Sequence, residues 1–138
     1  MFKLSLVTPE KKLVTDQEME EIIVPANAGE LNILPGHAPL LTTLVPGILK
    51  YKLKEATRFF EVAISWGYCQ VSAEGVNVLA EHAMTAGEIK PELIKKQLKD
   101  SEARLASESL DNVDWESAQH EVARLKAELD LVEPSKLH

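Results

Sequence analysis

The residue types most often used for acid–base, nucleophilic or metal chemistry are sparse in this chain. The four histidines are His37, His82, His120 and His138, and the one cysteine is Cys69. No two histidines have the i, i+4 spacing that places both rings on one face of a helix, as a helical metal site requires. The sequence also has no phosphate-binding glycine loop and no nucleophile elbow. We therefore expect no catalytic site, no metal ion and no cofactor.

The cysteine lies in the strand-like sequence "WGYCQVS". A reactive thiol needs electropositive neighbours, and this segment has none. We expect Cys69 to be a small buried apolar residue. With a single cysteine no internal disulfide can form, which favours a reducing cytosol.

The composition favours one compact domain with a small appendage. The chain has 138 residues, of which 45% are hydrophobic and 27% are charged, and its formal net charge is −7. Nucleic acids and anionic membrane surfaces attract basic proteins, so neither is the expected main partner. No apolar run is long enough to span a membrane. The apolar part of the segment "MFKLSLVTPEKKL" is short, and we expect no signal peptide there.

Residues up to about 85 alternate between apolar and polar side chains with a period of two. Phe2, Leu4 and Leu6 are one apolar set, and in 49–54 three apolar residues alternate with three lysines. This alternation is typical of half-buried strands, here with the lysines facing solvent. Short strands separated by frequent turns predict a β-sandwich or barrel.

From Pro91 onward the apolar residues recur every three to four positions, the period of a helix. One stripe consists of Ile94, Leu98, Ser101 and Leu105. The other consists of Trp115, Ala118, Val122, Leu125, Leu129 and Val132. Between them lie the N-cap candidates Asp111, Asn112 and Asp114, and Pro134 is expected to end the second helix. The two stripes predict an antiparallel helical hairpin.

The fold expected from these patterns is α+β. Residues 1–86 form a domain of short strands, a sandwich or a barrel, and residues 87–138 form a two-helix hairpin. Isolated helices of this length are only marginally stable in water, so the hairpin need not have one fixed position on the sandwich. Residues 82–90 are the expected hinge.

The stretch "GELNILPGHAPLLTTLVPG", residues 29–47, concentrates residues that control the backbone. Gly29, Gly36 and Gly47 are positions where φ > 0 costs little, and three prolines fix φ nearby. "LPGH" and "VPG" have the Pro-Gly order of a type II turn. One interpretation is a pair of edge turns in a sandwich. The other is a stiff docking edge that presents Glu30 and His37 to a partner, because a rigid loop loses little entropy on binding.

This stretch closely resembles the signature of the epsilon subunit of bacterial F-type ATP synthases, the counterpart of chloroplast epsilon and mitochondrial delta subunits. The resemblance extends to the strand sequence "VNVLAEHA" and to the two-helix C-terminal part. It implies that residues 1–86 are an antiparallel β-sandwich of about ten strands and that residues 87–138 are the helical hairpin. It further implies a noncatalytic subunit of the central rotor, peripheral to the cytoplasmic side of the bacterial plasma membrane.

The resemblance also implies partners and partner-binding residues. The sandwich would bind the gamma subunit and the c ring and help to transmit torque between proton flow and ATP synthesis. The hairpin would either fold against the sandwich or extend into the alpha/beta catalytic hexamer and inhibit ATP hydrolysis. The matching positions are Gly29 and Glu30 for the c ring, Pro35, Gly36, His37, Ala38 and Pro39 for gamma, and Arg124 and Lys126, with His120 as a partial case, for the hexamer.

Two departures from the family pattern bear on function. Some members bind ATP through an Ile-Asp-x-x-Arg pattern, but residues 89–93 read Ile-Lys-Pro-Glu-Leu, which predicts against ATP sensing. Where the family often has Ser-Gly-Gly, residues 65–67 read Ser-Trp-Gly. A tryptophan does not adopt φ > 0 as glycine does, so the local turn differs or the glycine is not needed for its dihedral. Trp66 would then widen an apolar contact surface.

Two alternative functions remain open on the sequence. A free-standing ATP-sensing regulator would use Lys95, Lys96 and Lys99 on the first helix, although charges along one helix face are usually only solvated. A free-standing adaptor would dock its hairpin on other helices, whereas the two stripes favour pairing with each other. Residues 91–138 contain seven Lys and Arg against eleven Asp and Glu. We therefore expect any inhibition to depend on shape and on Arg124 rather than on net charge.

Overall fold

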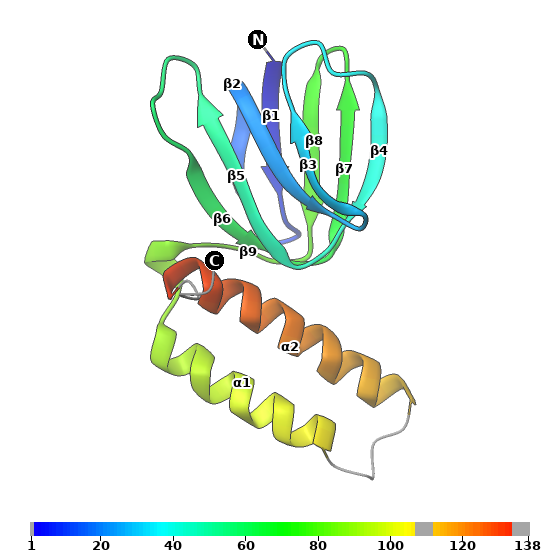
Figure 1. The fold of residues 1–138 in the computed structure, drawn as a ribbon, viewed down its shortest axis with the longest axis vertical. Coiled ribbons are helices and arrows are strands. Elements are labelled where there is room, and N and C mark those ends of the chain that lie inside the picture. The colour runs from blue at the N-terminus through cyan, green and yellow to red at the C-terminus, as the bar shows by residue number, and fades with distance from the viewer. Residues whose placement is uncertain (1, 107–111, 134–138) are drawn as a thin grey trace.

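A computed structural model describes residues 2–106 and 112–133, and it confirms the predicted fold class. In these described residues nine strands are followed by a 3₁₀ turn and two helices, and the family resemblance implies about ten strands (Figure 1). The strands are β1 Phe2–Val7, β2 Lys12–Ala26, β3 Gly29–Ile33, β4 Leu40–Leu44, β5 Gly47–Leu53, β6 Phe60–Ile64, β7 Gly67–Ser72, β8 Gly75–Ala80 and β9 Ala83–Thr85. The 3₁₀ turn η1 is Ala86–Glu88, and the helices are α1 Pro91–Ala106 and α2 Asn112–Val132.

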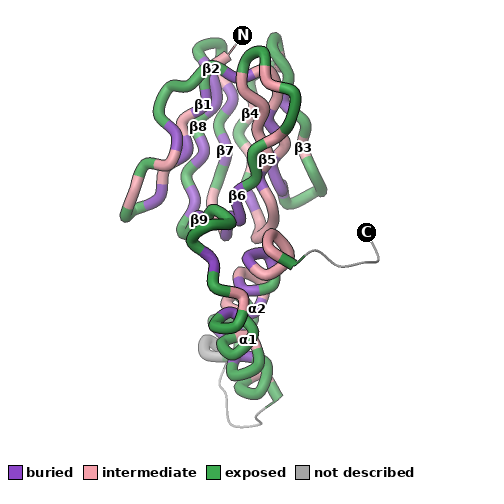
Figure 2. The backbone as a smooth tube through the Cα atoms, turned by 90° about the vertical axis from the view of Figure 1, so that its left-hand side faces the viewer, coloured by how far each residue is buried: buried purple, intermediate pink, exposed green. Residues whose placement is uncertain are grey.

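The strands form one hydrogen-bonded sheet that folds over on itself around a core. Its strand order is β1-β8-β7-β4-β2-β5-β6-β9, β3 pairs with β2, and β1 also pairs with β2. The 15-residue strand β2 joins the two layers, because it pairs with β1 and β5 as well as with β3 and β4. The buried parts of the strands line the inside of the sandwich (Figure 2).

The predicted alternation produces this core. Leu4, Leu6 and Leu49 are fully buried, and Tyr51 packs partly buried against the same cluster. Cys69 is also fully buried there, as expected, and burial raises the pKa of its thiol to about 11. Burying each large aliphatic side chain contributes about 1.5–3 kcal/mol to folding, so the period-two pattern is the main source of the sandwich's stability.

The sandwich is not antiparallel throughout. β1 runs parallel to β8, with Leu4 opposite Val76 and Leu6 opposite Val78, and the other strand pairs of the described sheet are antiparallel. A parallel pair needs a long connection between its strands. Here almost the whole sandwich lies between the two strands, so the connection is available without a crossover helix.

The helical hairpin is antiparallel, and α1 begins at Pro91 as predicted. Ile94 and Ser101 of the first stripe are buried, and in the second stripe Ala118 and Leu125 are fully buried. Trp115, the first residue of the second stripe, is instead 44% exposed. Two ion pairs also join the two arms of the described hairpin: Lys95 of α1 lies 2.9 Å from Glu133, directly after α2, and Arg104 lies 3.8 Å from Glu121. Of the predicted helix limits, Asp111 and Pro134 lie outside the described residues, and α2 begins at Asn112.

Helix α2 lies between the sandwich and α1 (Figure 1). Its Leu125 belongs to an apolar cluster with Ala63 of β6 and with Ile89 and Ile94. Partly buried residues complete the cluster, namely Ile48, Met84, Leu98, Leu129, Leu131 and Val132. The hairpin is therefore folded against β5 and β6, in the compact one of the two arrangements that the family resemblance implies.

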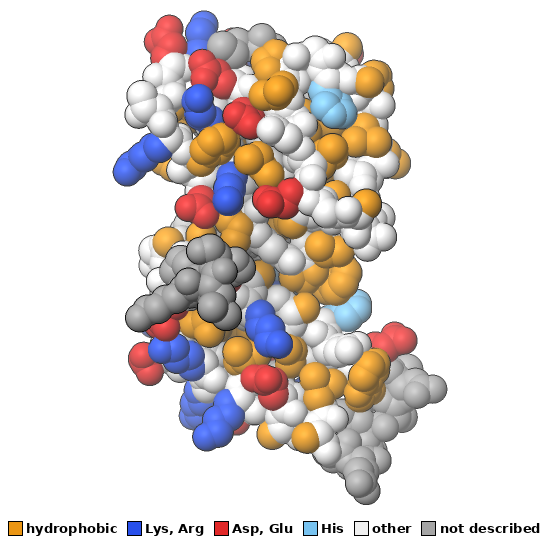
Figure 3. Space-filling view, in the orientation of Figure 1, with side chains coloured by type: hydrophobic (Ala, Val, Ile, Leu, Met, Phe, Trp, Pro, Cys, Tyr) orange, Lys and Arg blue, Asp and Glu red, His pale blue; other side chains and the backbone are white. Residues whose placement is uncertain are grey.

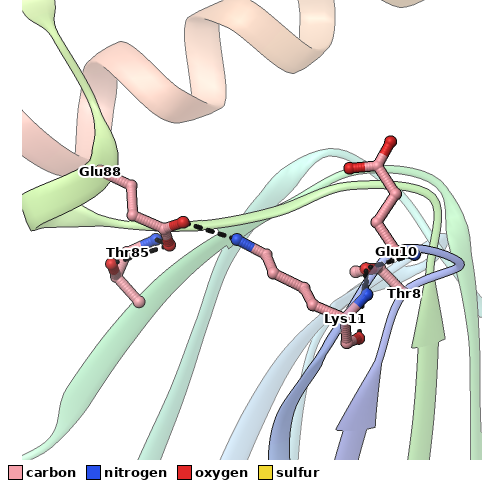
Figure 4. A network of polar contacts seen from close by, with 5 residues as sticks. All are labelled: Thr8, Glu10, Lys11, Thr85 and Glu88. Carbon is pink, nitrogen blue, oxygen red and sulfur yellow. Dashed lines mark hydrogen bonds and ion pairs between the residues drawn. The ribbon is translucent and has the colours of Figure 1, made fainter.

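The segment that leads into the hairpin is bound to the sandwich by a polar network (Figure 4). The Lys11 ammonium lies 2.6 Å from a Glu88 carboxylate oxygen. The other Glu88 oxygen accepts hydrogen bonds from the backbone N–H and the hydroxyl of Thr85, both at 3.0 Å. The hydrogen bond from Lys11 and those from Thr85 hold the pKa of Glu88 at about 2. The Thr8 hydroxyl in turn accepts the backbone N–H groups of Glu10 and Lys11 and so fixes the turn that carries the lysine.

Candidate docking surfaces

Three neighbouring strands present an uncharged surface to solvent, which we call the outer face. β4, β7 and β8 are in register so that Leu41 lies beside Gln70, and Thr43 beside Tyr68. Tyr68 in turn lies opposite Leu79. The outward-facing side chains on these strands are Leu41, Thr43, Tyr68, Gln70, Asn77 and Leu79. None of them is ionisable at neutral pH, although 27% of the chain is charged.

Large apolar side chains are exposed on this face. Leu41 is 68% exposed, Tyr68 49% and Leu79 39%. In Figure 3 orange hydrophobic side chains are visible on the right-hand side of the sandwich, the side on which Figure 1 shows β4. At the end of the face next to the hairpin, a shallow groove of about 250 Å³ is lined by residues that include Pro9, Trp66 and Glu81. A contiguous exposed apolar patch is typical of a protein–protein contact surface.

The segment 35–39 continues from one end of the outer face into β4. Leu34 to His37 form a turn in which the His37 N–H donates to the Leu34 carbonyl at 3.1 Å. Gly36 has φ +85°, so the predicted type II turn is present. The His37 ring is half-buried, and its Nδ1 lies 2.8 Å from the Ala38 carbonyl oxygen. The other residues of the segment are exposed, namely Pro35, Gly36, Ala38 and Pro39.

The second predicted turn is different. Gly47 is not among the glycines with positive φ, so "VPG" is not a type II turn. A Cβ atom at Gly47 would lie 2.7 Å from Cβ of Pro25, which is buried. The glycine is needed for this close approach of β5 to β2 and not for a left-handed backbone. Gly29 does have positive φ, +122°, in the turn between β2 and β3.

Glu30 and His37 lie at opposite ends of β3 and do not form one edge. Glu30 is exposed at the start of the strand and borders a groove of about 450 Å³ with Ile48, Lys50 and Leu131. That end of the sandwich is the one next to α2. The turn of His37 follows the other end of the strand, where it lies close to β1, β7 and β8. The stretch 29–47 therefore builds two separate surfaces.

The two basic residues predicted to reach a partner differ in the folded hairpin. Lys126 is exposed beside Pro46 and Gly47. The Arg124 guanidinium instead donates to the Glu128 carboxylate at 2.8 Å, and the Glu128 side chain is only 3% exposed. Arg124 is therefore held in a half-buried ion pair within α2.

Trp66 makes the contact between sandwich and hairpin that sequence reasoning did not foresee. Its ring stacks on the ring of His120 in α2, with centroids 4.5 Å apart and an interplanar angle of 28°. Among the described residues, the buried Nε1 of Trp66 has no hydrogen-bond partner. The one available signal was that residues 65–67 read Ser-Trp-Gly, a departure from the Ser-Gly-Gly pattern expected from the resemblance. The outer face was also missed, although alternation along "LLTTL", "YCQVS" and "VNVLA" places its side chains together.

The described residues offer no metal-binding group of three or more His, Cys, Asp or Glu side chains. Neither helix, over its described length, is long and apolar enough to cross a bilayer.

Comparison with known proteins places these features in a family. Residues 1–86 match the model of the ATP synthase delta/epsilon chain β-sandwich domain. The ATP synthase epsilon chain of Bdellovibrio bacteriovorus is 47% identical over 131 residues, covering 95% of this chain and 94% of that protein. The epsilon chain of Geobacter metallireducens is 45% identical over 103 residues, covering 75% of this chain and 72% of that one.

Solved structures show the same fold. A chain in the mitochondrial ATP synthase of Euglena gracilis, in an OSCP/F1/c-ring structure, superposes with a TM-score of 0.78 at 23% identity, covering 91% of this chain and 78% of that chain. A chain in the central stalk and c-ring structure of Tetrahymena thermophila mitochondrial ATP synthase superposes with a TM-score of 0.61 at 17% identity, covering 95% and 96%. From the sandwich match and the close relatives along nearly its whole length, this chain belongs to the family of ATP synthase epsilon chains.

Proposed function

We propose that this chain is a noncatalytic subunit of the central stalk of an ATP synthase. In this role the sandwich binds the gamma subunit and the c ring, and it turns with them as proton flow is coupled to ATP synthesis. Family membership and the likeness to chains of central-stalk and c-ring structures support this role. The complex carries the chain at the cytoplasmic side of the bacterial plasma membrane.

The proposal that the gamma subunit is a partner rests on the outer face. Three exposed apolar side chains on adjacent strands, with no charge between them, favour a permanent protein partner over solvent. The segment 35–39 borders the same face, so the family's gamma-contacting positions and the exposed apolar residues form one surface. The groove at Trp66 and Leu79 can accept a protruding side chain of the partner.

The turn of Gly29 and Glu30 is the proposed contact with the c ring. Both residues are exposed, and they lie at the far end of β3 from the segment 35–39. Two partners can therefore bind at the same time without competing for one edge. A carboxylate at a turn tip is suited to the polar loops that a membrane ring presents to the aqueous side.

The hairpin is the proposed regulatory element. In the folded position Arg124 is paired with Glu128, four residues further along the same helix. Extension of the hairpin would carry α2, with Arg124 and Lys126, away from the sandwich towards the catalytic hexamer and inhibit ATP hydrolysis. Because the Arg124–Glu128 pair lies within α2, it moves with the helix, and inhibition requires α2 to leave the sandwich.

The two partner assignments can be tested separately with the full-length chain. The chain is immobilised and presented in turn with purified gamma subunit and with detergent-solubilised c rings. Tyr68→Asp is expected to weaken gamma binding at least tenfold, because a buried unpaired carboxylate is costly at an interface. Glu30→Lys is expected to weaken c-ring binding and to leave gamma binding unchanged.

Gln97→Asp on the exposed side of α1 adds the same charge as Tyr68→Asp outside both surfaces and is the matched control. It is expected to change neither affinity. Binding of gamma by Tyr68→Asp as tight as that of the unchanged chain would show that the outer face is not the gamma site. Failure of the unchanged chain to bind either partner would contradict the central-stalk role.

A further inference from the structure

We propose that the stack of Trp66 on His120 is the latch that holds the hairpin against the sandwich in this chain. When the stack breaks, the hairpin pivots away about the residues between Glu88 and Pro91. The proposal deepens the regulatory role proposed above: it names the contact that sets how often the hairpin is released.

The sandwich presents Trp66 on a rigid support. The Ser65 N–H donates to the His82 carbonyl at 3.1 Å, and the His82 N–H donates to the Ser65 hydroxyl at 2.9 Å. The Glu81 N–H donates to the Trp66 carbonyl at 2.9 Å. These three bonds fix the β6–β7 turn to the segment after β8. The indole is therefore a preformed half of the contact, and only the hairpin has to move to make or break it.

His120 lies far along α2 from the pivot, so a contact there opposes tilting of the helix effectively. The apolar cluster under the hairpin involves α2 from Leu125 to Val132, the part next to the pivot. His120 lies twelve residues before Val132, about 18 Å along the helix axis. The cluster holds the hairpin near its pivot, and Ala123 and Lys126 of α2 lie beside Pro46 and Gly47. The stack at His120 lies farther from the pivot and resists tilting of α2 away from the sandwich.

The pivot is defined by what stays attached to the sandwich. β9 is hydrogen-bonded to β6, and Lys11 holds Glu88 of the following 3₁₀ turn. Residues 83–88 therefore remain with the sandwich when the hairpin moves. This places the flexible joint after Glu88, inside the range of residues 82–90 predicted from the sequence but at its C-terminal end.

The latch is reversible because closing it has a cost. In the described part of the chain the buried indole N–H of Trp66 lacks a hydrogen-bond acceptor. An unpaired buried donor costs free energy, so the gain from ring stacking is partly offset.

The experiment measures the position of the hairpin in the isolated full-length chain. Spin labels are attached at Asn77→Cys on β8 and Glu102→Cys on α1, both exposed positions, and their distance distribution is recorded by pulsed electron resonance. Cys69 stays unlabelled because it is fully buried. His120→Ala is expected to raise the ratio of released to folded hairpin roughly two- to tenfold, the range for loss of one aromatic pair.

Three further variants separate the stack from other causes. His120→Phe keeps a ring on α2 and is expected to retain the distribution of the unchanged chain. Trp66→Leu keeps an apolar side chain without the ring system and is expected to match His120→Ala, with no further change in the double variant. Gln119→Ala, an exposed neighbour of His120, is the control and is expected to have no effect.

An unchanged distribution in His120→Ala would overturn the proposal, and so would equal release in His120→Phe and His120→Ala. The measurement needs no gamma subunit, c ring or catalytic hexamer. If the latch fails and partner binding is intact, the central-stalk role stands and the latch proposal is wrong. If the latch is intact and the chain binds neither partner, the latch proposal stands and the central-stalk role is contradicted.

Discussion

The two outer surfaces of the sandwich differ in the charge of their outward side chains. On the side of β2, β5 and β6, Lys52 lies opposite Glu21, and Lys50 lies opposite Glu61. The outward side chains of β4, β7 and β8 are uncharged, and three large apolar ones are exposed. Opposite charges across strands stabilise a surface that stays in water. The comparison indicates that the first surface is complete in the isolated chain and that the second is complete only with a partner.

The hairpin packs against one end of this charged side. Ile48 and Ala63, on the same strands as the lysine and glutamate pairs, pack against α2. One end of the charged surface is thus covered by the chain itself, and the outer face is left for another protein. The predictions below test this contrast, beginning with the largest expected effect.

Gly67→Ala is expected to destabilise the sandwich by about 3 kcal/mol or more, because a Cβ atom there would overlap the carbonyl oxygen of Leu79. Backbone atoms of β8 cannot move aside as a flexible side chain can. Urea unfolding measures the free-energy difference. Gly87→Ala is the control, since no atom lies within 4 Å of its added Cβ atom. Equal stability of the two variants would mean that β7 and β8 are less closely apposed behind the outer face than the structure shows.

Arg124→Ala is expected to cost about 1–3 kcal/mol of stability, because it leaves the Glu128 carboxylate buried without its cation. The same variant is expected to lose inhibition of ATP hydrolysis in the assembled complex, at low and at high salt. Arg124→Ala/Glu128→Ala removes both charges and is expected to regain most of the stability but not the inhibition. Inhibition that persists in both variants would exclude Arg124 as the contact with the hexamer.

Lys50→Glu on the charged surface is expected to cost roughly 0.2–1 kcal/mol, since it places like charges opposite each other at Glu61. Tyr68→Asp on the outer face is expected to change stability by less than about 0.5 kcal/mol, because the side chain is already half exposed. Partner binding should show the reverse order, with gamma binding lost only in Tyr68→Asp. A loss of gamma binding in Lys50→Glu would remove the distinction between the two surfaces.

Glu88→Gln is expected to have a small effect on stability, below about 1 kcal/mol, because the Glu88 side chain is 43% exposed and solvent screens its pairing with Lys11. The pKa of Glu88 is lowered from 4.5 to about 2, so its contribution to stability is complete above pH 4.5 and is lost as the pH falls towards 2. Unfolding at pH 7 should therefore separate the variant from the unchanged chain, and unfolding near pH 2 should not. A difference that grows on acidification would contradict the assigned cause.

The sequence predicted features that depend on neighbouring residues. The period of two located the strands, the helical period located both helices, and Pro35-Gly36 specified its turn. Features set by contacts distant in sequence were missed: the parallel partner of β1, the close approach of Gly47 to Pro25, and the stack of Trp66 on His120. Local patterns determine which face of an element is apolar, but they do not determine which element covers it.

The same limit applies to the candidate surfaces. Glu30 and His37 are seven residues apart, which suggested one edge, yet β3 runs between them and separates them. An extended strand advances about 3.3 Å per residue, so a short separation in sequence becomes a large separation in space. The outer face shows the opposite case, since Leu41, Tyr68 and Leu79 are far apart in sequence and adjacent in the sheet. The assignment of individual residues to partners remains a prediction.

The parallel pairing of β1 with β8 has a consequence for how the chain folds during its synthesis. β1 meets β2 early, but its second neighbour, residues 75–79, follows about seventy residues later. At about 5–20 residues per second a ribosome needs roughly 4–15 s to deliver that strand. During this interval β1 has one open edge, and the nascent sandwich cannot close. The hairpin is translated after β8, so it emerges when the surface that it covers can already be formed.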